Sequence, residues 1–153
     1  MRAARRLLVV VLAWVPVVAG ACNLAPLPII GDGIGRLGDV SVSLGAADDP
    51  LCPAAWQGPL RIAIGRVPAC VVGDEVTIVE PPLMLGNGIL YVPTYSGSNN
   101  RLYAVDAGNC RVLWRSRGFN GPPRFGRGHI AIGHGQVRLD QKCRPVAMAA
   151  SAQ

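Results

Sequence analysis

Residues 81–114 read PPLMLGNGILYVPTYSGSNNRLYAVDAGNCRVLW, and this run alternates segments rich in strand formers with turn residues. The Asn87-Gly88 dipeptide favours a hairpin turn, because both residues tolerate a positive φ. Strands are expected at 89–94, 102–105 and 111–114, with a polar loop at 96–100 and a tight turn at 106–109. The run therefore predicts antiparallel β-structure.

Parts of this run recur elsewhere in the chain. Asp, Cys and Trp have the same spacing in two places, at Asp48, Cys52 and Trp56 and again at Asp106, Cys110 and Trp114, and a shorter third copy has Asp140 and Cys143. The segment 122–132 also echoes 81–92, since both begin with Pro-Pro and contain a turn glycine before an apolar stretch. Each copy predicts a strand, a turn capped by the Asp side chain and a second strand. The Trp is expected to pack against the neighbouring unit.

The order of glycine, apolar strand, polar loop, Tyr-Ala-Val-Asp, turn and closing Trp in 86–114 resembles one repeat of the quinoprotein-like (PQQ-type) β-propellers. The resemblance implies an all-β fold, and a composition with 19 Gly, 13 Pro and few charges suits short strands joined by turns. About 130 residues would hold about three four-stranded sheets. We therefore expect a partial β-propeller-like array of antiparallel blades, with a compact β-sandwich or trefoil as the alternative.

The N-terminus has the pattern of an export signal. Arg2, Arg5 and Arg6 precede an apolar core at 7–18, which is too short to span a bilayer comfortably and predicts a signal helix in a signal peptide at 1–21. The sequence VAGAC at 18–22 resembles a bacterial lipobox, and this resemblance implies that Cys22 is lipidated. Ordinary cleavage after Ala21 is the alternative.

Two further segments complete the expected domain organisation. Residues 22–39 are rich in Gly and Pro and predict a tether, and residues 40–153 are expected to form the β-repeat domain. The tether contains a GxGxxG match at Gly33, Gly35 and Gly38. A dinucleotide site needs a strand before these glycines and a helix after them, whereas here a Pro-rich tract precedes and a strand-like segment follows.

The cysteines agree with export. If a lipid occupies Cys22, an even number remains, and Cys52, Cys70, Cys110 and Cys143 become candidates for disulfides in an oxidising compartment. Sequence leaves their three possible pairings open. Buried free thiols are the alternative.

The chain lacks the features expected of catalysis. Quinoprotein dehydrogenases use adjacent cysteines, Ca²⁺ ligands and a catalytic Asp, and no adjacent cysteines are present here, so neither enzymatic activity nor a cofactor is predicted. The acids Asp74, Glu75 and Glu80 are interpreted as part of a solvated hairpin turn.

The two histidines of the chain are considered as ligands of a zinc site. His129 and His134, with Asp140 and Cys143 nearby, are residue types that hold zinc. Their spacing of five does not place both histidines on one strand face. They are therefore predicted to be surface or turn residues.

Charge is divided unevenly along the chain. Residues 22–100 carry three Arg against seven acids, whereas residues 101–153 carry nine Lys and Arg against two acids. The second part predicts a basic face for an anionic partner, or else solvated charge on strand edges.

These features together predict a non-enzymatic cell-envelope lipoprotein whose PQQ-like β-repeat body serves as a protein-interaction platform. In its ingredients it is similar to the propeller lipoproteins of the outer-membrane β-barrel assembly machinery. The expected partners are the membrane, through the lipid anchor, and an envelope protein or a second copy of the chain, but not nucleic acid. The alternative is a remnant or subunit of a PQQ-dependent envelope oxidoreductase.

Overall fold

A computed structural model of the protein describes residues 20–97 and 99–146, and within them the chain forms twelve β-strands and no helix. The strands are β1 (Ala25–Leu27), β2 (Ile34–Leu37), β3 (Val40–Ser43), β4 (Arg61–Ile64), β5 (Cys70–Val71), β6 (Leu83–Gly86), β7 (Ile89–Thr94), β8 (Arg101–Asp106), β9 (Val112–Arg115), β10 (Arg124–Gly126), β11 (His129–Ile132) and β12 (Gly135–Arg138). The prediction of an all-β fold is confirmed. The predicted signal peptide lies mostly outside the described residues.

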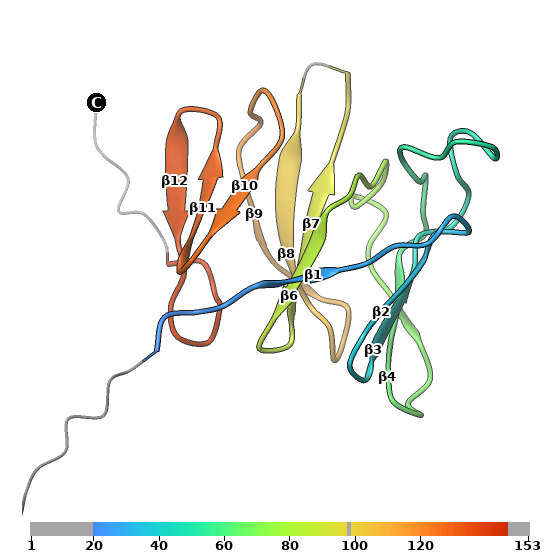
Figure 1. The fold of residues 1–153 in the computed structure, drawn as a ribbon, viewed down its shortest axis with the longest axis horizontal. Coiled ribbons are helices and arrows are strands. Elements are labelled where there is room, and N and C mark those ends of the chain that lie inside the picture. Colours follow the sequence, from blue (N-terminus) through green and yellow to red (C-terminus); the bar gives the residue numbers. More distant parts are fainter. Residues whose placement is uncertain (1–19, 98, 147–153) are drawn as a thin grey trace, which may run out of the picture.

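The strands form three antiparallel sheets, none of which closes on itself. The N-terminal sheet has the order β2-β3-β4-β5, the middle sheet has the order β1-β6-β7-β8-β9, and the C-terminal sheet has the order β10-β11-β12. Figure 1 shows the three sheets side by side, with the middle sheet between the other two. No helix in the described part of the chain is long and apolar enough to cross a membrane.

The middle sheet is buried on both faces. All six residues of β7 are buried. Because successive side chains of a strand point to opposite faces, Leu90 and Val92 pack toward the N-terminal sheet, whereas Ile89 and Tyr91 pack toward the C-terminal sheet. This double burial explains why 89–92 is uniformly apolar. The fold therefore has two sheet-to-sheet interfaces.

The three sheets repeat one hydrogen-bond pattern. Each sheet contains a hairpin, formed by β2–β3, β6–β7 and β10–β11, and the strand that follows it in sequence is β4, β8 or β12. The residue after that following strand donates its N–H to the carbonyl of the second turn residue of the hairpin. The pairs are Gly65 to Asp39 (2.8 Å), Ala107 to Gly88 (2.9 Å) and Leu139 to Gly128 (2.9 Å). The internal repetition is therefore present as a structural unit, and the hairpins predicted at Asn87-Gly88 and in 122–132 are parts of it.

Two of the three Asp-Cys copies form the same kind of turn. Asp106 is the last residue of β8 and Asp140 lies two residues after β12, and the N–H groups of Cys110 and Cys143 donate to their carbonyls at 2.8 and 3.0 Å. Both cysteines have the same left-handed φ of 59°. The predicted copy at 48–56 is not equivalent, because it lies in the connection between β3 and β4. In the N-terminal sheet the corresponding turn leads to Cys70 instead.

The segment predicted as a tether is part of the folded body, and that prediction is wrong. Residues 22–39 contain β1, which pairs with β6, and β2, which pairs with β3. Leu27 is 2 % exposed and packs between the N-terminal and middle sheets. The glycines of the GxGxxG match surround β2, where Gly38 takes φ of 58° in the β2–β3 turn. A strand, β3, follows them and not a helix, in agreement with the sequence context.

Candidate functional site

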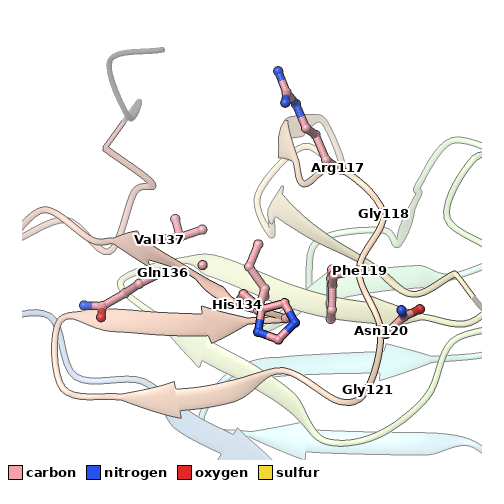
Figure 2. Close-up of a pocket in the computed structure, with 11 residues that line it drawn as sticks. Arg117, Gly118, Phe119, Asn120, Gly121, His134, Gln136 and Val137 are labelled. Carbon is pink, nitrogen blue, oxygen red and sulfur yellow. The ribbon is translucent and has the colours of Figure 1, made fainter. Parts of the chain in front are cut away.

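A groove opens where the middle and C-terminal sheets meet, and it has a volume of about 750 Å³. One wall is the chain that follows β9, and the other is the β11–β12 hairpin (Figure 2). The lining residues are Arg117, Gly118, Phe119, Asn120, Gly121, Ile132, Gly133, His134, Gly135, Gln136 and Val137. Its apolar side chains, Phe119, Ile132 and Val137, also pack on the interface between the two sheets.

The first wall is fixed by the residue that precedes β8. Asn100 and Phe119 exchange two backbone hydrogen bonds, each 2.9 Å long. The side-chain amide of Asn100 donates to the carbonyl of Gly121 at 2.7 Å. These three bonds hold the segment 117–121 against the middle sheet, so this wall is formed without a ligand.

The second wall is a tight hairpin turn. Ile132 pairs with Gly135, which leaves Gly133 and His134 at the tip. Gly133 has φ of 54°, a conformation that favours glycine, and a side chain there would stand 3.3 Å from the Cβ of Phe119. Glycine therefore allows both the turn and the close approach of the two walls. His134 is exposed at the tip and faces the groove near Phe119 (Figure 2).

The groove belongs to the basic part of the chain. Residues 101–146 carry nine Lys and Arg against Asp106 and Asp140. Both carboxylates accept backbone N–H groups within their own turns, from Gly108 and from Lys142 and Arg144, each at 2.8 Å. Arg117 stands at one end of the groove, and its guanidinium points away from Phe119 and His134 (Figure 2). Arg117 is exposed, so its positive charge lies at the solvent side of this end.

An acidic cleft lies on the other side of the molecule's middle sheet, with a volume of about 550 Å³ and with Asp48, Trp56, Ile78, Glu80 and Tyr95 among its lining residues. Hydrogen bonds from the backbone N–H groups of Ala55 and Ala54 hold the pKa of the Asp48 carboxyl below its ordinary value. Burial, and then the negative charge of Asp48, raises the pKa of Glu80.

The other two predicted turn acids lie elsewhere. Asp74 and Glu75 are exposed in the turn that follows β5, where Val76 donates its N–H to the carbonyl of Gly73 at 3.0 Å. Glu80 is separate from this turn and half-buried in the acidic cleft. Two of the three acids therefore lie in a solvated turn, but this turn does not form a hairpin, because Val79 beyond it pairs with Trp56 and Thr94.

The residues considered for zinc are not brought together. His129 is on β11 with its Nδ1 3.2 Å from the carbonyl of Arg127, whereas His134 is in the hairpin turn. Cys143 is in a disulfide and Asp140 is held in its turn. Among residues 20–97 and 99–146, no three His, Cys, Asp or Glu side chains are grouped to hold a metal ion.

The disulfides differ from those predicted. Cys70 pairs with Cys110, and Cys22 pairs with Cys143, whereas Cys52 is an exposed free thiol. The expectation that bonds form only among the four later cysteines is therefore wrong. The Cys22 sulfur that a lipid thioether would need is already bonded, and Cys22 is buried at 3 % exposure. The pairing fits the alternative of ordinary cleavage after Ala21, which leaves this thiol available.

The two repeated tryptophans lie at different sheet-to-sheet interfaces. Trp56 is 4 % exposed between the N-terminal and middle sheets. Trp114 is half-buried and packs on the cluster between the middle and C-terminal sheets. Both therefore have the packing role that the repeat predicted, although Trp56 reaches it from a different place in its sheet.

The groove residues were missed by the sequence analysis because most of them are turn formers. Gly118, Asn120, Gly121 and the Gly-His-Gly run at 133–135 are typical of loops. The available signal was an isolated Phe119 between glycines in a basic segment.

No protein-family model matches the chain, and no curated protein matches it either.

Proposed function

We propose that this protein is exported to an oxidising compartment of the cell envelope, where it acts as a non-enzymatic platform that binds a partner protein. The two disulfides support export, because such bonds persist in oxidising compartments and are rare where thiols are kept reduced. They join distant parts of the chain, since their cysteines are 121 and 40 residues apart in sequence. An exported body of this size gains much of its stability from such cross-links.

We also infer that the three sheets are blades of a partial β-propeller-like array. The repeated hydrogen bond after the strand that follows each hairpin supports this arrangement, as does the packing of the middle sheet between its two neighbours. A sandwich has only two sheets, so the third sheet favours the array.

The observation that carries the binding function is the open groove between the middle and C-terminal sheets. Its walls are fixed by hydrogen bonds to Asn100 and by the hairpin at Gly133, and its floor is apolar. Preformed concave sites that combine apolar lining with a few polar groups are typical of binding sites. The proposal leaves out the lipid anchor, because the Cys22 sulfur is bonded to Cys143.

Site-specific photo-crosslinking tests the proposed function. A photoreactive amino acid is placed at His134 or Gln136, which line the groove, and at Arg66 as an exposed control in the N-terminal sheet's turn. In the organism that makes the protein, we expect an adduct from the two groove positions and not from residue 66. Absence of any adduct above the control at both groove positions would refute the platform. An adduct of twice the chain's mass would identify the partner as a second copy.

The fate of Cys22 is tested by intact-mass measurement of the exported protein. We expect a chain that begins at residue 22 and has a free α-amine. Its mass should be lower than that of the fully reduced chain by the hydrogens that are lost when two disulfides form. A mass that includes acyl groups would restore the lipid anchor and exclude the Cys22–Cys143 bond.

A further inference from the structure

The groove residues indicate what kind of partner segment fits there, and this inference rests on the proposed function. Four of the eleven lining residues are glycines, at Gly118, Gly121, Gly133 and Gly135, and all four are exposed. Without side chains, these positions let the main chain of a partner approach both walls closely, although the Gly121 carbonyl already accepts from Asn100. Extended peptides bind through main-chain groups, with pockets for individual side chains adding specificity.

The apolar lining gives the position of one anchoring side chain. Phe119 and Ile132 are half-buried, and Val137 is buried at 6 % exposure. They come from both walls, so an aliphatic or aromatic side chain placed between them would lose water on two sides. A Leu or Phe of the partner suits this position, because burial of such side chains is the main favourable contribution to binding.

The charges around the groove favour an acidic segment. Arg115 ends β9 two residues before Arg117, and both are exposed. The acids of this half of the chain lie at the opposite ends of the strands. Asp106 ends β8, whereas the groove segment is held at Asn100 before β8 begins.

Asp140 follows the same rule, since it comes after β12 ends, whereas the Gly133–His134 turn precedes the strand. In Figure 1 the turns before and after β12 lie at opposite ends of the strands of the C-terminal sheet. Within the described residues 101–146, both carboxylates therefore lie at the ends of their strands away from the groove. An excess of positive charge steers an oppositely charged partner and fixes its orientation.

We infer that the groove binds an extended acidic polypeptide segment that inserts one aliphatic or aromatic side chain between Phe119, Ile132 and Val137, with its carboxylates toward Arg117. The segment lies between the β11–β12 hairpin and residues 117–121. Its main chain meets the glycine positions of both walls.

Fluorescence anisotropy with three labelled peptides of equal length tests this inference on the oxidised, exported protein. One peptide is acidic with a central Leu-Phe, the second is acidic with a central Gly-Ser, and the third is basic with a central Leu-Phe. We expect the first to bind, the second to bind about tenfold more weakly because the apolar contact is lost, and the third not to bind. Raising the salt concentration should weaken the first peptide, because the exposed charges become screened.

A charge reversal at the groove has a matched control elsewhere in the basic half. Arg117→Glu should weaken the acidic Leu-Phe peptide about fivefold, whereas Arg111→Glu, which makes the same change in net charge in the β8–β9 turn, should weaken it less than twofold. Both positions are exposed, so both variants should fold, and near-ultraviolet circular dichroism checks this. Equal effects of the two variants would overturn the inference, because they would reduce the effect to general charge.

Other outcomes separate the inference from the proposed function. Equal binding of the basic and acidic Leu-Phe peptides, or failure of the acidic one to bind at millimolar concentration, overturns the inference. Arg117-dependent binding to vesicles of anionic phospholipid, without peptide binding, overturns it as well and replaces the peptide by a lipid headgroup. If His134 still gives a crosslinked partner in these cases, the platform stands and only the chemistry of its partner changes.

Discussion

The two interfaces of the middle sheet differ in how completely they are packed. Among the residues that the structure describes, the interface with the N-terminal sheet holds sixteen buried hydrophobic residues, including Trp56. The interface with the C-terminal sheet holds ten, and its Trp114 is half-buried. A disulfide accompanies each interface, Cys70–Cys110 at the first and Cys22–Cys143 at the second. The groove opens at the second interface, where apolar side chains remain accessible. The more loosely packed contact thus contains the groove proposed for binding, and the tighter one contains the larger buried cluster.

Removal of the disulfides should have the largest effect on this comparison. Replacing Cys22 and Cys143 by Ser opens a loop of 121 residues and should cost about 5 kcal/mol of unfolding free energy, against about 4 kcal/mol for Cys70 and Cys110 with 40 residues between them, by the chain-entropy relation. Urea unfolding of the two double variants measures both costs. A larger loss for the Cys70–Cys110 pair would mean that the tighter interface depends more on its cross-link than loop length alone requires.

The two tryptophans test the packing itself. Trp56→Ala should cost about 3–5 kcal/mol, because it empties a site in the sixteen-residue cluster. Trp114→Ala should cost about 2 kcal/mol, because part of its ring is already in water. Denaturant unfolding of both variants, with unchanged slopes, gives the difference. Equal costs would show that the second interface is as tightly packed as the first.

Local chemistry made part of the fold predictable from sequence. The Asn87-Gly88 turn and its apolar flanks specified the β6–β7 hairpin, and the strands expected at 89–94 and 102–105 are β7 and the middle of β8. The Asp-Cys turns were also visible, because Asp106 and Asp140 accept neighbouring N–H groups within a few residues. These features depend on residues that are close in the chain.

Features that depend on distant contacts were not predictable. Residues 76–79 are rich in strand formers, but Ile78 takes φ of 56° and interrupts the extended backbone, so the pairing is limited to the bridges of Val79 with Trp56 and Thr94. The Gly and Pro of 22–39 indicated a tether, but Leu27 is buried by partners far along the chain. The groove combines two turn segments, 117–121 and 132–137, whose proximity is set by sheet order.

A smaller loss of unfolding free energy is expected from removing a side-chain hydroxyl of the middle sheet that hydrogen-bonds to the C-terminal part. The Tyr91 hydroxyl donates to the carbonyl of Cys143 at 2.7 Å in a buried site. Burial, and then the charge of Asp140, raises the pKa of Tyr91 well above its ordinary value. Tyr91→Phe leaves that carbonyl without its partner and should cost about 1–3 kcal/mol. Urea unfolding measures this cost, and a neutral result would show that water replaces the hydroxyl at the looser interface.

The smallest expected effect concerns the acidic cleft beside the tighter interface. Because the pKa of Glu80 is raised in the folded protein, the folded state binds its proton more tightly than the unfolded state does. The stabilisation is complete below the ordinary value of 4.5 and is lost as pH rises through the folded pKa. Glu80→Gln removes this loss, so the variant should gain stability relative to the parent above pH 4.5, by a few tenths of a kcal/mol because solvent screens a partly exposed group. Urea unfolding from pH 3 to pH 8 measures the difference, with Glu75→Gln as the control for removal of one exposed carboxylate. A difference that is flat across this range would show that the cleft leaves Glu80 as well solvated as the unfolded chain does.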